Sequence, residues 1–311
     1  MTRATLRMTR MMKKNTILIA ALLGATVWTG CQKVENVLSP KEEAPRGTTW
    51  TVTVRAEKVD GPQTKGLAIG DEFDGTLLES IWKAGEEVKV YLNNTCIGTL
   101  TATPDGSDAH KATLSGDITT TGIVANTTTL TLLTPRESWD YTGQVGTLLE
   151  EAGSIEKKYH YTLASDVLVT GVTGNNITTA DASFTNQQSI YRLSFKYSGS
   201  GITAKSVTIS SANGHLVQSQ ALGGAATEGP ISVTLGTAAT SDPFFVALRN
   251  GDTNSEDITF TIVDNTGVTY RGTKTIPAAA KGNGTFVSMK GTNLPQRLDL
   301  GLSSTEVTTA L

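Results

Sequence analysis

Short runs in which apolar and polar residues alternate recur along most of the chain. In residues 49–56, Trp50, Val52 and Val54 alternate with threonine and arginine, which is the period of a half-buried β-strand. Threonine is abundant, and β-branched residues favour the pleated surface of a strand. Because no helical segments alternate with the runs, the sequence predicts a mainly β protein and excludes a doubly wound fold. The later runs include EVKVYLN, CIGTLTAT, ATLSGDI, TTLTLLTP, DVLVTGV, SIYRLSFKYSG, AKSVTISSANG and DITFTIVDNTG.

Turn residues separate these runs and suggest how they are grouped. Asn265–Thr266–Gly267 lies between two runs and Asn213–Gly214 follows another, so each predicts a hairpin. Only LLEEAGSIEKKY could form a helical turn or two. A chain of 311 residues has room for about two domains. Because a second series of runs begins near Ala182, we expect an N-terminal domain over residues 48–180 and a C-terminal domain over 181–311.

The first 30 residues resemble a bacterial lipoprotein signal peptide. Lys13–Lys14 precedes an apolar run from Thr16 to Trp28, and Cys31 follows. A run of about 13 apolar residues is too short to span a bilayer but suits a signal peptide. We expect translation to start at Met12 and Cys31 to become the lipidated N-terminus, which places the precursor at the outer membrane. The alternative is an ordinary secretory signal in which Cys31 is incidental.

The segment after this cysteine is polar, charged and contains prolines, with the sequence QKVENVLSPKEEAPRG. Such a composition is typical of a linker. We therefore expect residues 31–47 to be a lipidated tether between the membrane and the folded part of the chain.

Charge and motifs argue against several functions. The net charge is −3 and no basic stripe is present, so a nucleic-acid partner is not expected. The usual catalytic and phosphate-binding motifs are absent, and His110, His160 and His215 are scattered. We expect these histidines to be surface or packing residues. The sequence predicts no enzyme, no metal site and no cofactor.

Two further features have simple structural explanations. The paired carboxylates at Glu86–Glu87, Glu150–Glu151 and Glu256–Asp257 are expected to lie on solvated faces. Residues Asp140–Leu148, DYTGQVGTL, are expected to form a structural turn, with a sugar-binding loop as the alternative.

Several segments follow one another in a recognisable order: the leader, TWTVTVRA, TKGLAIGDE, WKAGEEVKVYLN, TPRESWDYTGQVGTL and ADASFTNQQSIYRLSFKY. Their order resembles the fimbrillin-like lipoproteins of Bacteroidetes, which supply the subunits of type V pili. The resemblance covers most of the chain from Cys31 onward, although no single motif is highly specific. It implies two tandem transthyretin-like β-sandwich domains and a structural role in a surface pilus that mediates adhesion.

The resemblance also implies how such a subunit would assemble. A trypsin-like protease cuts the precursor in the loop after the first strand, and Lys65 matches that position. Arg46, which precedes the strand, and Arg55, which lies within it, match less well. The strand containing Trp50, Val52 and Val54 then leaves, and a strand of another subunit fills the groove. The alternative is that Lys65 lies in an ordinary exposed connection.

The C-terminal segment QRLDLGLSSTEVTTAL suits the role of the inserted strand, because apolar residues alternate in its first half. The candidate donor residues are Leu298, Leu300, Leu302, Val307 and Leu311. The alternative is that this segment is only the last strand of the second domain. The implied partners are other pilus subunits, in a homopolymer or a heteropolymer, together with the outer membrane and a surface receptor.

The alternative function is that of a lipid-anchored glycan-binding protein in an outer-membrane nutrient-uptake system. Such a protein would use exposed tryptophans as a flat sugar platform. Trp50 and Trp82 lie in apolar patterns that predict burial, whereas Trp139 in ESWDY is the candidate platform residue.

Overall fold

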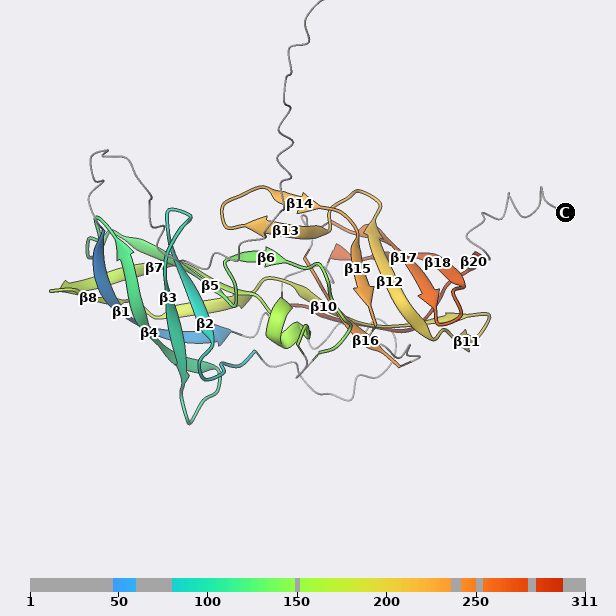
Figure 1. Ribbon diagram of the computed structural model, residues 1–311, viewed down its shortest axis with the longest axis horizontal. Coiled ribbons are helices and arrows are strands. Elements are labelled where there is room, and N and C mark those ends of the chain that lie inside the picture. The colour runs from blue at the N-terminus through green and yellow to red at the C-terminus, as the bar shows by residue number, and fades with distance from the viewer. Residues whose placement is uncertain are drawn as a thin grey trace, which may run out of the picture.

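A computed structural model describes residues 47–59, 80–148, 152–235, 242–249, 254–278 and 284–298. Within these ranges the chain forms strands β1 to β20 and one short helical turn, so the prediction of a mainly β protein is confirmed. Figure 1 shows the strands in two groups, with a smaller sheet and the helical turn between them.

The first group is one sheet that closes on itself. Its strand order is β4-β3-β2-β5-β7-β8-β1-β9, and β4 also pairs with β1, which joins seven strands into a ring. The expected sandwich has two separate sheets, and this group does not, because the β1–β4 pairing connects what would be two edges. Its strands are β1 (Thr48–Val59), β2 (Glu87–Leu92), β3 (Thr95–Pro104), β4 (Lys111–Thr120), β5 (Thr129–Thr134), β7 (Thr162–Thr173), β8 (Asn176–Thr179) and β9 (Ala182–Asn186).

The interior of the ring is filled by the inward residues of these strands, including Val52, Val90, Leu114 and Phe184. Two glycines allow β3 and β4 to approach closely as the ring closes. A Cβ atom on Gly98 would lie 2.5 Å from the Asp117 carbonyl oxygen, and one on Gly116 would lie 2.5 Å from that of Thr99. A side chain at either position would therefore push the two strands apart.

The second group consists of two sheets that share one hydrophobic cluster. The rings of Phe195 and Phe260, one from each sheet, lie 5.2 Å apart. The first sheet contains β10 (Ser189–Tyr197), β11 (Ser200–Gly201), β16 (Phe244–Leu248) and β19 (Phe286–Asn293). The second contains β12 (Ala204–Ser211), β15 (Ile231–Thr234), β17 (Glu256–Asp264), β18 (Thr269–Ile276) and β20 (Gln296–Leu298).

The two predicted hairpins have different outcomes. The turn at Asn265–Gly267 joins β17 to β18, which pair antiparallel, so this prediction is confirmed. The chain also turns at Asn213–Gly214, but the following strand, β13 (Val217–Ala221), does not return along β12. The hairpin prediction is wrong there, because β15 and β17 already occupy both edges of β12.

A third sheet connects the two groups (Figure 1). It consists of β14 (Ala226–Glu228), β13 and β6 (Ser138–Asp140), and β6 pairs antiparallel with β13. The turn of π-helix η1 (Ile155–Tyr159) lies in the segment for which a helical turn was expected. Trp139 and Tyr159 pack in the cluster of the second group, whereas β9 pairs with β1 and β7 of the ring. Contacts therefore cross the expected boundary at residue 180 in both directions.

Candidate functional site

Strand β1 is hydrogen-bonded along both of its edges. On one side it pairs antiparallel with β4, from Thr48 opposite Thr120 to Glu57 opposite Lys111. On the other side it runs parallel first to β8 and then to β9. Its removal would therefore open the ring and leave a slot with strands on both sides.

The residues of β1 alternate between the interior and the solvent, as the sequence predicts. Val52, Val54 and Ala56 are buried in the ring, and the residues between them are exposed. Trp50 is half-buried at the start of the strand, and its Nε1 donates to the Thr120 carbonyl at 3.3 Å. The inward positions are thus apolar up to Ala56.

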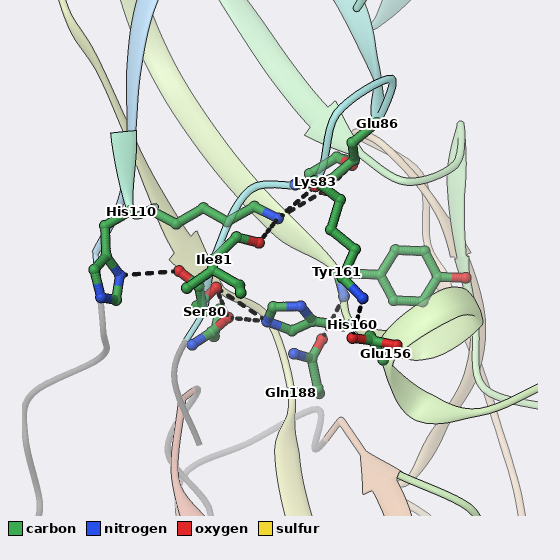
Figure 2. A network of polar contacts seen from close by, with 12 residues as sticks. Ser80, Ile81, Lys83, Glu86, His110, Glu156, His160, Tyr161 and Gln188 are labelled. Carbon is green, nitrogen blue, oxygen red and sulfur yellow. Dashed lines mark hydrogen bonds and ion pairs between the residues drawn. The ribbon is translucent and has the colours of Figure 1, made fainter. Parts of the chain in front are cut away.

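The next inward position is occupied by a lysine. Lys58 is only 3% exposed, and its Nζ donates to both carboxylate oxygens of Glu86 at 2.8 Å and to the Ile81 carbonyl at 3.0 Å. Nζ also lies 4.3 Å from the centre of the Trp82 ring, which favours a cation. In Figure 2, the dashed lines that end at Glu86 and at Ile81 mark the hydrogen bonds of this ammonium. Desolvation lowers the pKa of Lys58, and the Glu86 carboxylate partly offsets this effect.

Glu86 has further partners besides Lys58. Its Oε1 accepts from the Thr134 hydroxyl at 2.9 Å and its Oε2 from the Lys83 backbone N–H at 3.3 Å. The side chain is 17% exposed, whereas that of Glu87 is 61% exposed. The expectation of a solvated face is therefore wrong for Glu86, because the turn before β2 directs its carboxylate to the buried ammonium of Lys58.

The other carboxylate pairs differ from one another. Glu256 is buried beside His215, so the expectation is also wrong there, whereas Asp257 is exposed. Glu150 and Glu151 lie outside the described residues.

A second polar cluster lies next to this ion pair and contains two of the scattered histidines. Nε2 of His160 lies 2.7 Å from Oδ1 of Asn186 and 3.2 Å from Oγ of Ser80, while Nδ1 of His110 lies 3.1 Å from the Ser80 carbonyl oxygen (Figure 2). Desolvation and, after it, the charge of Lys58 lower the pKa of His160 to about 4. The imidazole is therefore neutral at pH 7.

This cluster does not have the geometry of a catalytic triad. Ser80 and Asn186 contact the same nitrogen of His160, whereas a triad uses both ring nitrogens. An amide oxygen can only accept, so Nε2 donates its proton to Asn186 and cannot act as a base toward Ser80. Ser80 is itself 2% exposed. The cluster is suited to holding β9 and the segment before β2 together beneath Lys58.

The predicted assembly residues are only partly within the described ranges. Arg55 is exposed, but it pairs with Thr113 in the middle of β1, where its peptide bond is held in the sheet. Proteases prefer exposed loops over paired strands, so this position is poorly accessible to them. Lys65, Arg46 and Cys31 lie outside the described residues.

The candidate donor segment begins in an edge strand. Leu298 is the last residue of β20 and pairs with Thr269 of β18, which is what the alternative of a final strand predicts for this residue. Leu300, Leu302, Val307 and Leu311 lie outside the described residues.

The proposed sugar platform is not formed. Trp139 is 3% exposed, and the Arg249 guanidinium lies 4.0 Å from the centre of its ring. The following loop is also structural, because the Gln144 side chain accepts from the Ala247 N–H at 2.8 Å and donates to the Ala247 carbonyl at 2.7 Å. Trp50 and Trp82 are half-buried and buried, as expected.

The described ranges contain neither a candidate metal site nor a helix that could cross a membrane. No group of three or more histidine, cysteine, aspartate or glutamate side chains there could hold a metal ion. In the same ranges, no helix has the length and apolar character needed to cross a membrane.

Comparison with known proteins gives only distant structural similarity. No protein-family model matches the chain, and no curated protein matches it. A proposed cell adhesion protein of Bacteroides fragilis is 14% identical, with 80% of this chain and 95% of that chain covered and a TM-score of 0.39. A proposed adhesin of Bacteroides ovatus is 10% identical, with coverage of 85% and 99% and a TM-score of 0.38. The shaft pilin of Lactobacillus rhamnosus is 11% identical, with 81% of this chain and 100% of that chain covered and a TM-score of 0.28.

Proposed function

We propose that this protein is a structural subunit of a surface pilus involved in cell adhesion, and that it assembles by exchanging β1 for a strand of a neighbouring subunit. The observation that supports this most directly is the position of β1 in the ring. The strand is paired on both edges, so its departure leaves a slot that another strand can fill with the same hydrogen bonds.

The vacant slot could not remain open at low cost. Burying a valine stabilises a protein by about 1.5–3 kcal/mol. When β1 leaves, the slot loses its apolar contacts with the buried side chains of Val52, Val54 and Ala56. The backbone groups of β4, β8 and β9 would also lose their hydrogen bonds along the slot. An open slot of this kind is a template for strand addition. This is the physical driving force for assembly in the proposed mechanism.

The remaining parts of the mechanism come from the sequence. Cleavage after Lys65 frees the segment that contains β1, and lipidation of Cys31 anchors the precursor at the outer membrane. This chain in turn donates the segment that contains Leu298, Leu300, Leu302, Val307 and Leu311 to a neighbouring subunit. The two groups of strands correspond to two β domains of the pilin type, approximately 48–180 and 181–311, with β9 completing the first group from beyond residue 180. No observation favours the alternative of a glycan-binding protein, since Trp139 is buried.

Limited proteolysis tests this proposal. Trypsin treatment of the purified full chain should cut after Lys65, and the cut protein should exchange its peptide that contains Trp50 for an added fluorescent peptide of residues 48–59. The Lys65→Gln variant should take up none of the added peptide under the same conditions, and Arg55→Gln is a matched control that should behave like the original protein. If the cut protein retains its own peptide and takes up none of the added one, the strand-exchange mechanism is wrong.

A further inference from the structure

The buried lysine of β1 restricts which strand could take the place of β1. Along the inward face of the strand, Val52, Val54 and Ala56 are followed by Lys58, whose ammonium contacts both oxygens of Glu86. Glu86 belongs to the segment that stays behind when β1 leaves. Any strand that fills the slot therefore meets a carboxylate at this position.

Removal of Lys58 leaves this carboxylate poorly compensated. Within the described ranges, its remaining hydrogen bonds come from the Thr134 hydroxyl and the Lys83 backbone N–H, both neutral donors. The Lys83 ammonium is paired with Glu156. An apolar side chain inserted at the Lys58 position would cover Glu86 without neutralising it, which is costly for a buried charge.

The candidate donor segment of this chain does not supply the missing charge. The basic residue of segment 296–311, Arg297, precedes the alternating leucines and is out of phase with them. With Leu298, Leu300 and Leu302 at the positions of Val52, Val54 and Ala56, the neutral Ser304 falls at the position of Lys58.

We propose that the slot of β1 selects a strand with a lysine or arginine two residues after its last inward apolar residue, and that this strand comes from a different kind of chain. This inference rests on the proposed strand exchange and specifies its partner. A second copy of this protein, offering residues 298–311, is the wrong occupant. The buried ion pair then fixes both the register and the identity of the incoming strand, a role known for polar groups buried in other interfaces.

Peptide exchange measures this selectivity. The full chain is cut at Lys65 and incubated with fluorescent synthetic peptides, and their binding is followed by polarisation and native mass spectrometry. A peptide of residues 48–59 and its Lys58→Arg version should both bind. The Lys58→Met version and a peptide of residues 296–311 should each bind at least about tenfold more weakly, as expected for an unpaired buried charge.

A matched control separates charge from position. A peptide with both Glu57→Lys and Lys58→Glu has the same composition and net charge as the original, but its lysine faces the solvent. It should bind as weakly as the Lys58→Met peptide or more weakly. In the Glu86→Met protein, the Lys58→Met peptide should regain affinity, because neither partner of the pair is then a buried charge.

The outcomes distinguish the two proposals. If the original peptide exchanges but the Lys58→Met peptide or the 296–311 peptide binds equally well, the selectivity is refuted and strand exchange stands. If no peptide exchanges at all, including the original, strand exchange itself fails and the selectivity fails with it. Equal affinity of the Lys58→Met peptide for the original and the Glu86→Met proteins would also refute the role of Glu86.

Discussion

At the scale of single residues, the ion pair of Lys58 and Glu86 is the most consequential contact of β1. Both side chains are largely removed from water, so each depends on the other for compensation of its charge. The arrangement could in part be anticipated, because Lys58 continues the even-numbered inward series of Val52, Val54 and Ala56. Its partner could not, because Glu86 is 28 positions away and only the closed ring brings it to the end of β1.

Breaking this pair should destabilise the protein measurably. We expect Lys58→Met to lower the free energy of unfolding by roughly 3 kcal/mol, because it leaves Glu86 uncompensated. The double variant Lys58→Met, Glu86→Met should recover most of the loss. Urea denaturation followed by tryptophan fluorescence measures the free energy of unfolding of both variants. The control is the exposed ion pair of Lys111 and Asp108, where Lys111→Met should change this free energy little. A double variant as unstable as Lys58→Met would contradict the coupling.

The neutral state of His160 predicts a pH dependence of stability. Its pKa is about 4 in the folded protein against 6.5 normally, so the unfolded chain binds more protons between these values. The free energy of unfolding should therefore be highest above pH 6.5. It should fall by up to about 3 kcal/mol as the pH drops toward 4. The facing charges are Lys58, which lowers this pKa, and Glu86 and Glu156, which raise it.

Thermal melts between pH 4 and 8 measure this effect, with His160→Gln as the comparison. The variant should lose a large part of the pH dependence over this window. If it keeps the whole dependence, other groups are responsible.

At the scale of strands, β1 is the strand that leaves in the proposed exchange, whereas β20 begins the segment that is donated. β1 is paired on both edges, whereas β20 pairs with β18 at the end of its sheet. The alternation in residues 49–56 was sufficient to predict β1, its inward face and its burial. The closure of β4 onto β1 was not predictable, because pairing between strands so far apart in the chain depends on how the whole sheet coils.

Deletion of Ser303–Leu311 tests the donor role at this scale. The truncated protein should keep its melting temperature within about 2 °C, as expected for a change of a few tenths of a kcal/mol. It should no longer donate a strand to a pilus, which electron microscopy of surface filaments would show. Unchanged filaments would assign the donor role to another segment.

At the scale of the whole molecule, the sequence predicted the fold class and the approximate position of a second series of strands. It missed the sheet in which β6 pairs with β13, because these short strands are far apart in sequence and offer no periodicity of their own. It also offered Trp139 as the candidate platform residue of the alternative function, although the side chain is buried. The short motif around this residue could not reveal that Arg249 and the second hydrophobic cluster cover its ring.

The mixed pairing of β1 has a consequence for polarity. A replacement strand that restores the same bonds must run antiparallel to β4 and parallel to β8 and β9, so it enters beside Thr120 and finishes beside Glu86. A fibre assembled in this way would have two unlike ends, one with a vacant slot and the other with an unused donor strand.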